Sequence, residues 1–230
     1  MRNDRSLAPL TNEAMEMKAI LFDCDGVLVD TEEPANNAMA SLFSEAGLEI
    51  TGAECRRRFQ GLSLPAVSEK LAFEHGIFIA PDMIAKTVEG ALSSGIREVP
   101  GATELIRDAT AQDLQICVAS SGSVSKMRMT LWQAGLLPFF EDRLFSTSQV
   151  KHGKPAPDIF VFAAKCLGVD IEDCVVIEDS LAGIRAGVSS GARVLALCRD
   201  AFTDPVTAKQ EGAIPISSLA EGHKLLGLLG

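Results

Sequence analysis

Short apolar runs recur along the chain, and polar segments with helical spacing separate them. Four clear runs cover residues 18–22, 116–120, 174–178 and 193–198, and two weaker ones cover 143–146 and 213–216. Apolar runs of this length that end at turn-forming residues are typical of buried strands. The pattern therefore predicts a sheet whose strands are covered on both faces.

Helical patterns lie between these runs. The clearest begins at Pro155 and Pro157 and stops at Gly168. Proline in the first turn and glycine just past the end are the expected helix signals. Another follows Asp179 and Ser180. Strands that alternate with helices predict an α/β fold with a parallel sheet.

One segment breaks the alternation, because residues 34–47, 65–76 and 82–96 all have helical patterns with no strand between them. The α/β pattern resumes after Pro100 and Gly101. These observations predict a helical insert at residues 31–97, placed within a core of residues 17–30 and 98–230. The polar first 16 residues resemble no secretory signal and are predicted to be a disordered extension.

Composition narrows the classes of partner. The 230 residues carry a net charge of −10, from 31 acidic and 21 basic side chains, which disfavours a nucleic acid or an anionic membrane as partner. No stretch approaches the roughly 18 apolar residues of a membrane span. The six scattered cysteines form no CxxC pair, as expected of reduced thiols in a cytoplasmic protein. A monomer is the default expectation.

Polar side chains follow the predicted strands at the points where they end. In an open parallel sheet, ligands bind outside the carboxyl ends of the strands, so these side chains are expected at one edge. The groups are four carboxylates, two hydroxyls and one ammonium: Asp23, Asp25, Glu178, Asp179, Ser120, Ser121 and Lys154.

Helix capping and turn formation explain Ser120, Ser121 or Asp179 taken alone, but not the whole set. Two carboxylates ~5 Å apart repel by roughly 3 kcal/mol at an effective dielectric constant of ~20. Several such pairs need a cation, and hard oxygen ligands without imidazole indicate Mg²⁺. A carboxylate-bound metal facing a lysine and hydroxyls is typical of phosphoryl chemistry, in which one carboxylate attacks phosphorus and a second transfers protons.

Four segments together resemble the motifs of the haloacid dehalogenase superfamily, in the family's order. The first is Asp23-Cys-Asp25-Gly-Val-Leu-Val-Asp30, and the second is Val118-Ala-Ser120-Ser121-Gly-Ser. The third is Lys154-Pro-Ala-Pro-Asp158, and the fourth is Ile177-Glu178-Asp179-Ser180. The resemblance implies a Rossmann-like core with a mobile cap, and a helical insert between the first two motifs is similar to the β-phosphoglucomutase and phosphoglycolate phosphatase branch.

The resemblance also implies a role for each motif residue. Asp23 is expected to be the nucleophile and a Mg²⁺ ligand, and Asp25 the general acid/base with its carbonyl on the metal. Asp179 is expected to bind the metal directly, and Glu178 directly or through water. The transferring phosphoryl group is expected to lie against three further residues: Ser120, Ser121 and Lys154.

Departures within the family sharpen the expected activity. Asp25 favours phosphate esters, because the dehalogenases lack an acid at that position. The mutases carry a histidine where this chain has Ala35 and a cap arginine where it has Leu64. The favoured prediction is a Mg²⁺-dependent phosphatase acting on a small-molecule phosphate ester through an aspartyl-phosphate. The alternatives are a sugar-phosphate mutase and a non-catalytic protein that binds a phosphorylated ligand.

The insert contains three consecutive arginines, Arg56, Arg57 and Arg58. Such a run cannot share one helical face and is explained most simply as a solvated helix end. The competing hypothesis assigns substrate specificity to this region, and its residues are Arg58, Gln60, Gly61 and Ser63.

Overall fold

A computed structural model describes residues 17–59, 62, 64–93, 95–199 and 203–228. Its contacts divide the chain into two compact units, one formed by residues 29–97 and the other by the rest of the chain. The predicted extension at residues 1–16 lies outside the described residues. No helix in the described part is long and apolar enough to cross a membrane.

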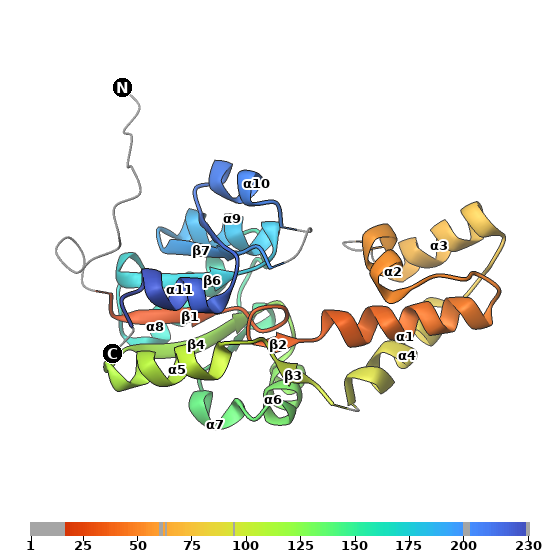
Figure 1. The fold of residues 1–230 in the computed structure, drawn as a ribbon. Helices are drawn as coiled ribbons and strands as arrows, with labels where there is room; N and C mark the ends of the chain where they lie inside the picture. Colours follow the sequence, from red (N-terminus) through yellow and green to blue (C-terminus); the bar gives the residue numbers. More distant parts are fainter. Residues whose placement is uncertain (1–16, 60–61, 63, 94, 200–202, 229–230) are drawn as a thin grey trace. The chain divides into compact units, whose positions relative to one another are not determined.

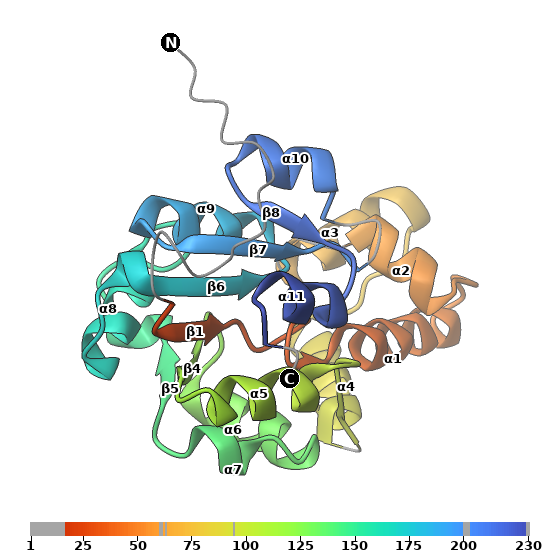
Figure 2. The same cartoon turned by 60° about the vertical axis from the view of Figure 1, so that its left-hand side comes forward.

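The larger unit contains a six-stranded sheet whose neighbouring strands are all parallel. In spatial order the strands are β5 (Leu144–Ser146), β4 (Gln115–Ser120), β1 (Ala19–Phe22), β6 (Cys174–Glu178), β7 (Arg193–Leu197) and β8 (Ile214–Ile216). All six predicted runs are strands, and Figure 2 shows β6 and β7 side by side with the same direction. The predicted α/β fold with a parallel sheet is therefore confirmed.

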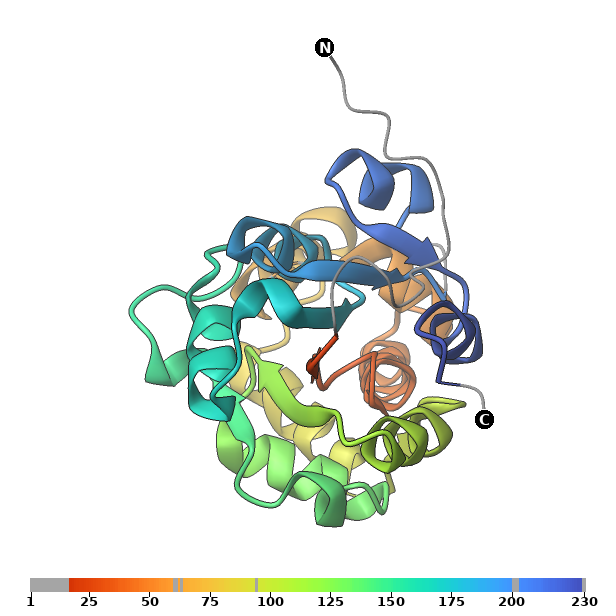
Figure 3. The same cartoon turned by 90° about the vertical axis from the view of Figure 1, so that its left-hand side faces the viewer.

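Helices cover both faces of this sheet, as Figure 3 shows. The helices of this unit are α5 (Ala102–Ala111), α6 (Val124–Gln133), α7 (Leu137–Phe140), α8 (Asp158–Leu167), α9 (Leu181–Ser190), α10 (Pro205–Gln210) and α11 (Leu219–Leu225), with short 3₁₀ turns at Thr147–Gln149 and Ile171–Asp173.

Alternate residues of β1 point to opposite faces, as in any strand. Ala19 and Leu21 pack in a buried cluster with Ile159 and Phe160 of α8. On the other face, the ring of Phe22 meets the ring of Phe140 edge-on at 6.0 Å. Because every residue of β1 is buried, the strand is apolar throughout.

The smaller unit is helical and has its own core. It contains α1 (Glu32–Glu45), α2 (Gly52–Phe59), α3 (Leu64–His75) and α4 (Pro81–Ser93), which Figure 1 draws from red-orange to yellow. Phe43 of α1 and Phe59 of α2 stack edge-on at 5.4 Å within the buried cluster. Two short strands, β2 (Val29–Asp30) and β3 (Arg97–Glu98), pair where the chain enters and leaves this unit.

The order of the strands determines where a ligand can bind. From β1 the chain crosses to β4 and β5 on one side, and then returns to β6, β7 and β8 on the other side. β1 is thus the switch point of the sheet, and ligands in such sheets bind outside the carboxyl ends of the strands at this point. The segments that follow β1, β4 and β6 are therefore the place to look for a site.

Candidate functional site at the carboxyl edge of the sheet

Asp23 directly follows β1 and remains attached to the sheet. Its backbone N–H donates to the carbonyl of Ile177 in β6 at 3.0 Å, and its side chain is buried. The chain then turns, and Gly26 takes a positive φ of 84°. A side chain at Gly26 would have its Cβ 2.0 Å from Asp179 Oδ2, so the carboxylate of Asp179 lies directly against this turn. Glycine here allows the first and fourth motifs to approach each other.

Lys154 lies between two of the predicted carboxylates. Its Nζ donates to Asp23 Oδ1 at 2.6 Å, to Glu178 Oε1 at 2.7 Å and to the carbonyl of Ala119 at 3.0 Å. These bonds use all three N–H donors of the ammonium group. The side chain of Lys154 is only 4% exposed, so little water screens the charges. The third motif therefore holds the first and fourth motifs together.

Glu178 is the most deeply buried member of this group, with a 1% exposed side chain. Its second oxygen, Oε2, accepts hydrogen bonds from the backbone N–H of Ser180 at 2.7 Å and from its hydroxyl at 3.0 Å. A Cβ on Gly183 would lie 1.6 Å from Glu178 Oε1, so only glycine leaves room for this carboxylate. Both oxygens are thus engaged, which favours Glu178 as an anchor for Lys154.

Burial and charge shift the pKa values of this group in defined directions. Loss of solvent raises the pKa of Asp23 from its ordinary value of 3.8 to about 7, although Lys154 opposes the shift. Burial alone would lower the pKa of Lys154, but Asp23 and Glu178 outweigh it and the pKa of the ammonium rises. Lys154 is therefore held as a cation within a low-dielectric site.

The predicted serines lie at the end of β4 and differ in exposure. Ser120 is buried and its Oγ accepts the N–H of Gly122 at 3.1 Å, whereas Ser121 is exposed and its carbonyl accepts from Thr147 Oγ1 at 3.4 Å. The hydroxyl of Ser120 keeps its own proton available as a donor. The structure thus brings the second motif to the same edge as the other three.

Two site residues were missed by the sequence analysis. Lys126, in the first turn of α6, donates from Nζ to Asp25 Oδ2 at 2.8 Å. Thr203 donates from its hydroxyl to the carbonyl of Asp179. A cation in the first turn of a helix is an unusual placement and was a usable signal for Lys126. No sequence pattern indicates Thr203.

The donor set fits a hard divalent cation. Among the described residues, no three Asp, Glu, His or Cys side chains converge closely enough to hold a metal by themselves. Mg²⁺, however, is usually bound through only one or two carboxylates and keeps several waters. Asp23 has an oxygen beyond the one that Lys154 contacts, and Asp179 lies against the turn that follows Asp25.

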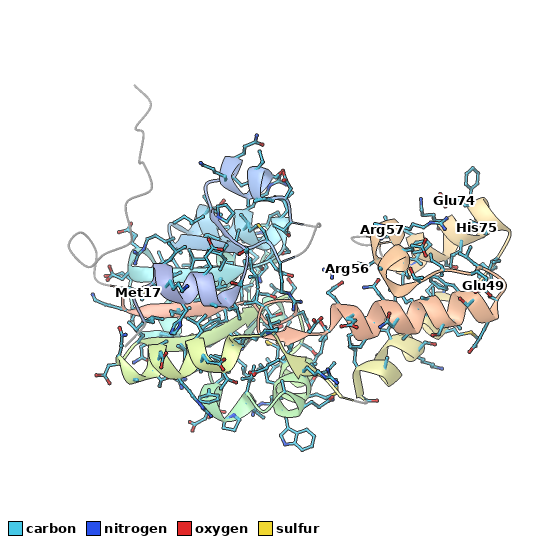
Figure 4. The ribbon with its side chains drawn as sticks, in the orientation of Figure 1. Met17, Glu49, Arg56, Arg57, Glu74 and His75 are labelled. Carbon is cyan, nitrogen blue, oxygen red and sulfur yellow. The ribbon has the colours of Figure 1, made fainter. Side chains whose placement is uncertain are left out.

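Of the predicted specificity residues in the helical unit, only Arg58 is among the described residues, since Gln60, Gly61 and Ser63 lie outside them. Arg58 contacts the end of α3, where its NH2 donates to Glu74 Oε2 at 3.1 Å and meets His75 Nε2. Figure 4 shows Glu74 and His75 together at this end of α3. In this arrangement Arg58 links α2 to α3.

The chain matches known proteins over most of its length. Residues 17–191 match the model of the haloacid dehalogenase-like hydrolases. The chain is 31% identical to 6-phosphogluconate phosphatase of Escherichia coli (strain K12) over 194 residues, which cover 83% of this chain and 86% of that protein. It is 27% identical to the phosphorylated carbohydrates phosphatase of Thermotoga maritima, covering 93% of this chain and 98% of the relative.

Solved structures agree with these matches. A HAD family hydrolase from Deinococcus radiodurans R1, with bound phosphate and sodium, has a TM-score of 0.85 at 31% identity and covers 94% of this chain and 99% of its own. A putative β-phosphoglucomutase from Thermotoga maritima has a TM-score of 0.79 at 26% identity, with coverages of 93% and 100%. The hydrolase family and the phosphatases among the relatives support the assignment of an enzyme that hydrolyses phosphoric monoesters. The four motifs, the fold and the matches lead to one conclusion: the chain belongs to the haloacid dehalogenase-like hydrolases.

Proposed function

We propose that this protein is a Mg²⁺-dependent phosphatase that hydrolyses a small phosphorylated sugar or sugar acid through an aspartyl-phosphate on Asp23. The observation that carries the proposal is the buried contact of Lys154 with Asp23 and Glu178 at the switch point of the sheet. This contact places a fixed cation beside a carboxylate nucleophile, as phosphoryl transfer needs.

In the proposed first step, a carboxylate oxygen of Asp23 attacks phosphorus and the bond to the ester oxygen breaks. Lys154 donates to Asp23 Oδ1 before substrate binds. All three of its donors are already in use, so we infer that one of them transfers from Asp23 to a phosphoryl oxygen. Glu178 and the carbonyl of Ala119 then keep the ammonium in place. The hydroxyl of Ser120 and the N–H of Ser121 complete the cradle for the phosphoryl oxygens.

Asp25 is proposed to move the protons. It gives a proton to the departing ester oxygen, and then takes one from the water that attacks the aspartyl-phosphate. The products are an alcohol, inorganic phosphate and free Asp23. A bound Mg²⁺, held by Asp23, Asp179 and the carbonyl of Asp25, would screen the repulsion between the anionic nucleophile and the phosphate.

The names of the relatives suggest the class of substrate. They include 6-phosphogluconate phosphatase and hexitol phosphatase A of Escherichia coli and a phosphorylated carbohydrates phosphatase of Thermotoga maritima. We therefore propose a phosphorylated sugar, sugar acid or sugar alcohol. A mutase remains the second candidate because a putative β-phosphoglucomutase has the same fold, but Ala35 and Leu64 replace the histidine and arginine expected of mutases.

We propose that residues 31–97 act as the cap over this site, and that Arg58, Gln60, Gly61 and Ser63 take part in selecting the substrate. A cytoplasmic location and a monomeric state belong to the same proposal, and the six cysteines, all free thiols in the structure, support the first of these.

A substrate panel tests the proposal. Phosphate release is measured from 6-phosphogluconate, a hexitol phosphate, glucose 6-phosphate and p-nitrophenyl phosphate, each with Mg²⁺ and with EDTA. We expect release that needs Mg²⁺ and that Asp23→Asn abolishes. The product of glucose 1-phosphate is analysed in parallel, since conversion to glucose 6-phosphate without release of phosphate would establish the mutase. Binding of phosphate with no turnover of any ester would establish the non-catalytic alternative.

A further inference from the structure

Lys126 contacts the proposed general acid/base from a part of the chain outside the family's four motifs. Its Nζ lies 2.8 Å from Asp25 Oδ2, although the two residues are 101 positions apart. The side chains of Lys126 and Asp25 are 38% and 26% exposed, respectively, so the pair is partly accessible to solvent. By contrast, Lys154 and Asp23 are almost completely buried.

The first turn of α6 fixes the place of Lys126. Ser123 caps this helix, and its Oγ accepts the backbone N–H of Lys126 at 3.2 Å. Gly122 lies directly beside this pair, since a Cβ there would be in ordinary van der Waals contact, 3.6 Å from Lys126 Cδ and 3.7 Å from Asp25 Oδ2. The Ser-Gly-Ser segment that follows β4 thus starts the helix in the register that directs the lysine to Asp25.

A second contact holds α6 against the same turn. Thr130 lies one turn after Lys126, and its Oγ1 is 3.8 Å from the sulfur of Cys24, between the two catalytic aspartates. Both residues are buried. The helix that carries Lys126 is therefore packed on the segment that carries Asp25, so the ion pair does not depend on two freely moving side chains.

The placement of Lys126 conflicts with the preference of the helix itself. A helix N-terminus carries a partial positive charge and favours acidic side chains. The first turn of α6 has no acidic residue and instead carries this lysine. A local preference that is broken at a site is the expected mark of a functional requirement, because such positions retain residues that folding alone would not select.

We propose that Lys126 is a positioning residue that holds the carboxyl group of Asp25 in the orientation for proton transfer. The proposal rests on the proposed phosphatase function. The ammonium donates to one carboxylate oxygen, so the other oxygen carries the proton that goes to the leaving group and later accepts one from water. Asp25 is more exposed than Asp23, so without Lys126 its side chain can rotate between several orientations. The carboxyl group then spends a smaller fraction of the time in the orientation that transfers the proton.

Four variants test the role: Lys126→Met, Lys126→Arg, Asp25→Asn and the double variant Lys126→Met/Asp25→Asn. Lys165→Met, an exposed lysine on α8, is the matched control. We expect Lys126→Met to lower kcat about tenfold, a part of the roughly 10²–10⁴-fold that a general acid/base contributes. KM and the inhibition constant of inorganic phosphate stay within about twofold, since the interaction acts on the proton-transfer step. Lys126→Arg recovers part of the loss, and Lys165→Met behaves as the wild type.

The double variant shows whether Lys126 acts through Asp25. If it does, Lys126→Met lowers residual kcat no further when Asp25 is already Asn. An equal loss on both backgrounds, or a raised phosphate inhibition constant, would instead make Lys126 a substrate-binding residue and overturn the proposal. If the wild type is active and Lys126→Met has an unchanged kcat, the positioning role of Lys126 is refuted, whereas the phosphatase function stands. A wild type without Mg²⁺-dependent phosphate release refutes the phosphatase itself.

Discussion

Asp23→Asn is expected to abolish activity and yet to stabilise the metal-free protein at alkaline pH. Asp23, Glu178 and Lys154 are all buried, and two carboxylates share one ammonium. One negative charge is therefore in excess in a site that excludes water, and burial of such a charge is costly. Asparagine keeps the shape of the side chain and removes that charge.

The magnitude follows from the pKa of Asp23, which rises from 3.8 to about 7 on folding. Between these values the unfolded chain has released its proton while the folded chain still holds it, so stability falls as the pH rises. The gap of about three units corresponds to a loss of roughly 4 kcal/mol, complete above about pH 7. Asp23→Asn does not show this loss of stability, because its amide side chain releases no proton in this pH range.

Urea unfolding in EDTA at pH 5 and pH 8 measures the effect. We expect the gain in unfolding free energy of Asp23→Asn over the wild type to be larger at pH 8 by about 2–3 kcal/mol. Asp142→Asn is the control, because the side chain of Asp142 is 98% exposed, and it should show no such change between the two pH values. Equal or lower stability of Asp23→Asn at pH 8 would refute the reasoning from buried charge.

Two substitutions next to the same carboxylates should destabilise the fold, whereas one glycine substitution in the helical unit should stabilise it. Lys154→Met leaves Asp23 and Glu178 buried without their cation, so we expect a loss of about 3–5 kcal/mol in urea unfolding and no phosphate release; native stability would contradict this. Gly183→Ala places a Cβ against Glu178 and should cost about 1–3 kcal/mol. Gly90→Ala, in helix α4 with open space around the added Cβ, should stabilise by roughly 0.5–1 kcal/mol, and equal melting shifts for the two glycine variants would refute the steric argument.

The sequence predicted the six-stranded sheet because most strand residues are buried, so each strand appears as a short, mainly apolar run. The paired strands β2 and β3 were not predicted, because each contains only two residues and so shows no periodic pattern. Helix α2 escaped because its two buried positions, Cys55 and Phe59, are separated by the three arginines.

The candidate site was predictable to the extent that its residues follow strands. Asp23, Ser120 and Glu178 lie at strand ends, and the topology of a parallel sheet brings strand ends together. Lys126 lies inside a helix, and only the three-dimensional packing of α6 on the turn after β1 reveals its contact with Asp25. The anchoring role of Glu178 likewise depends on Lys154, whose three bonds no local pattern specifies.

The charges of the site explain why phosphate and a divalent cation should bind together. Four carboxylates, Asp23, Asp25, Glu178 and Asp179, face two ammonium groups, Lys126 and Lys154, so the site is negative before any substrate enters. A phosphate ester adds further negative charge and would be repelled by such a site at short range. A bound divalent cation would turn the repulsion between the site and the ester into attraction. The ester in turn would supply oxygen ligands to the cation, for which the side chains provide only a few. Each ligand thus lowers the cost of binding the other, and this coupling must be equal in both directions. The uncompensated carboxylate charge lowers the stability of the protein without its ligands. The same charge makes binding of the cation and binding of the substrate depend on each other.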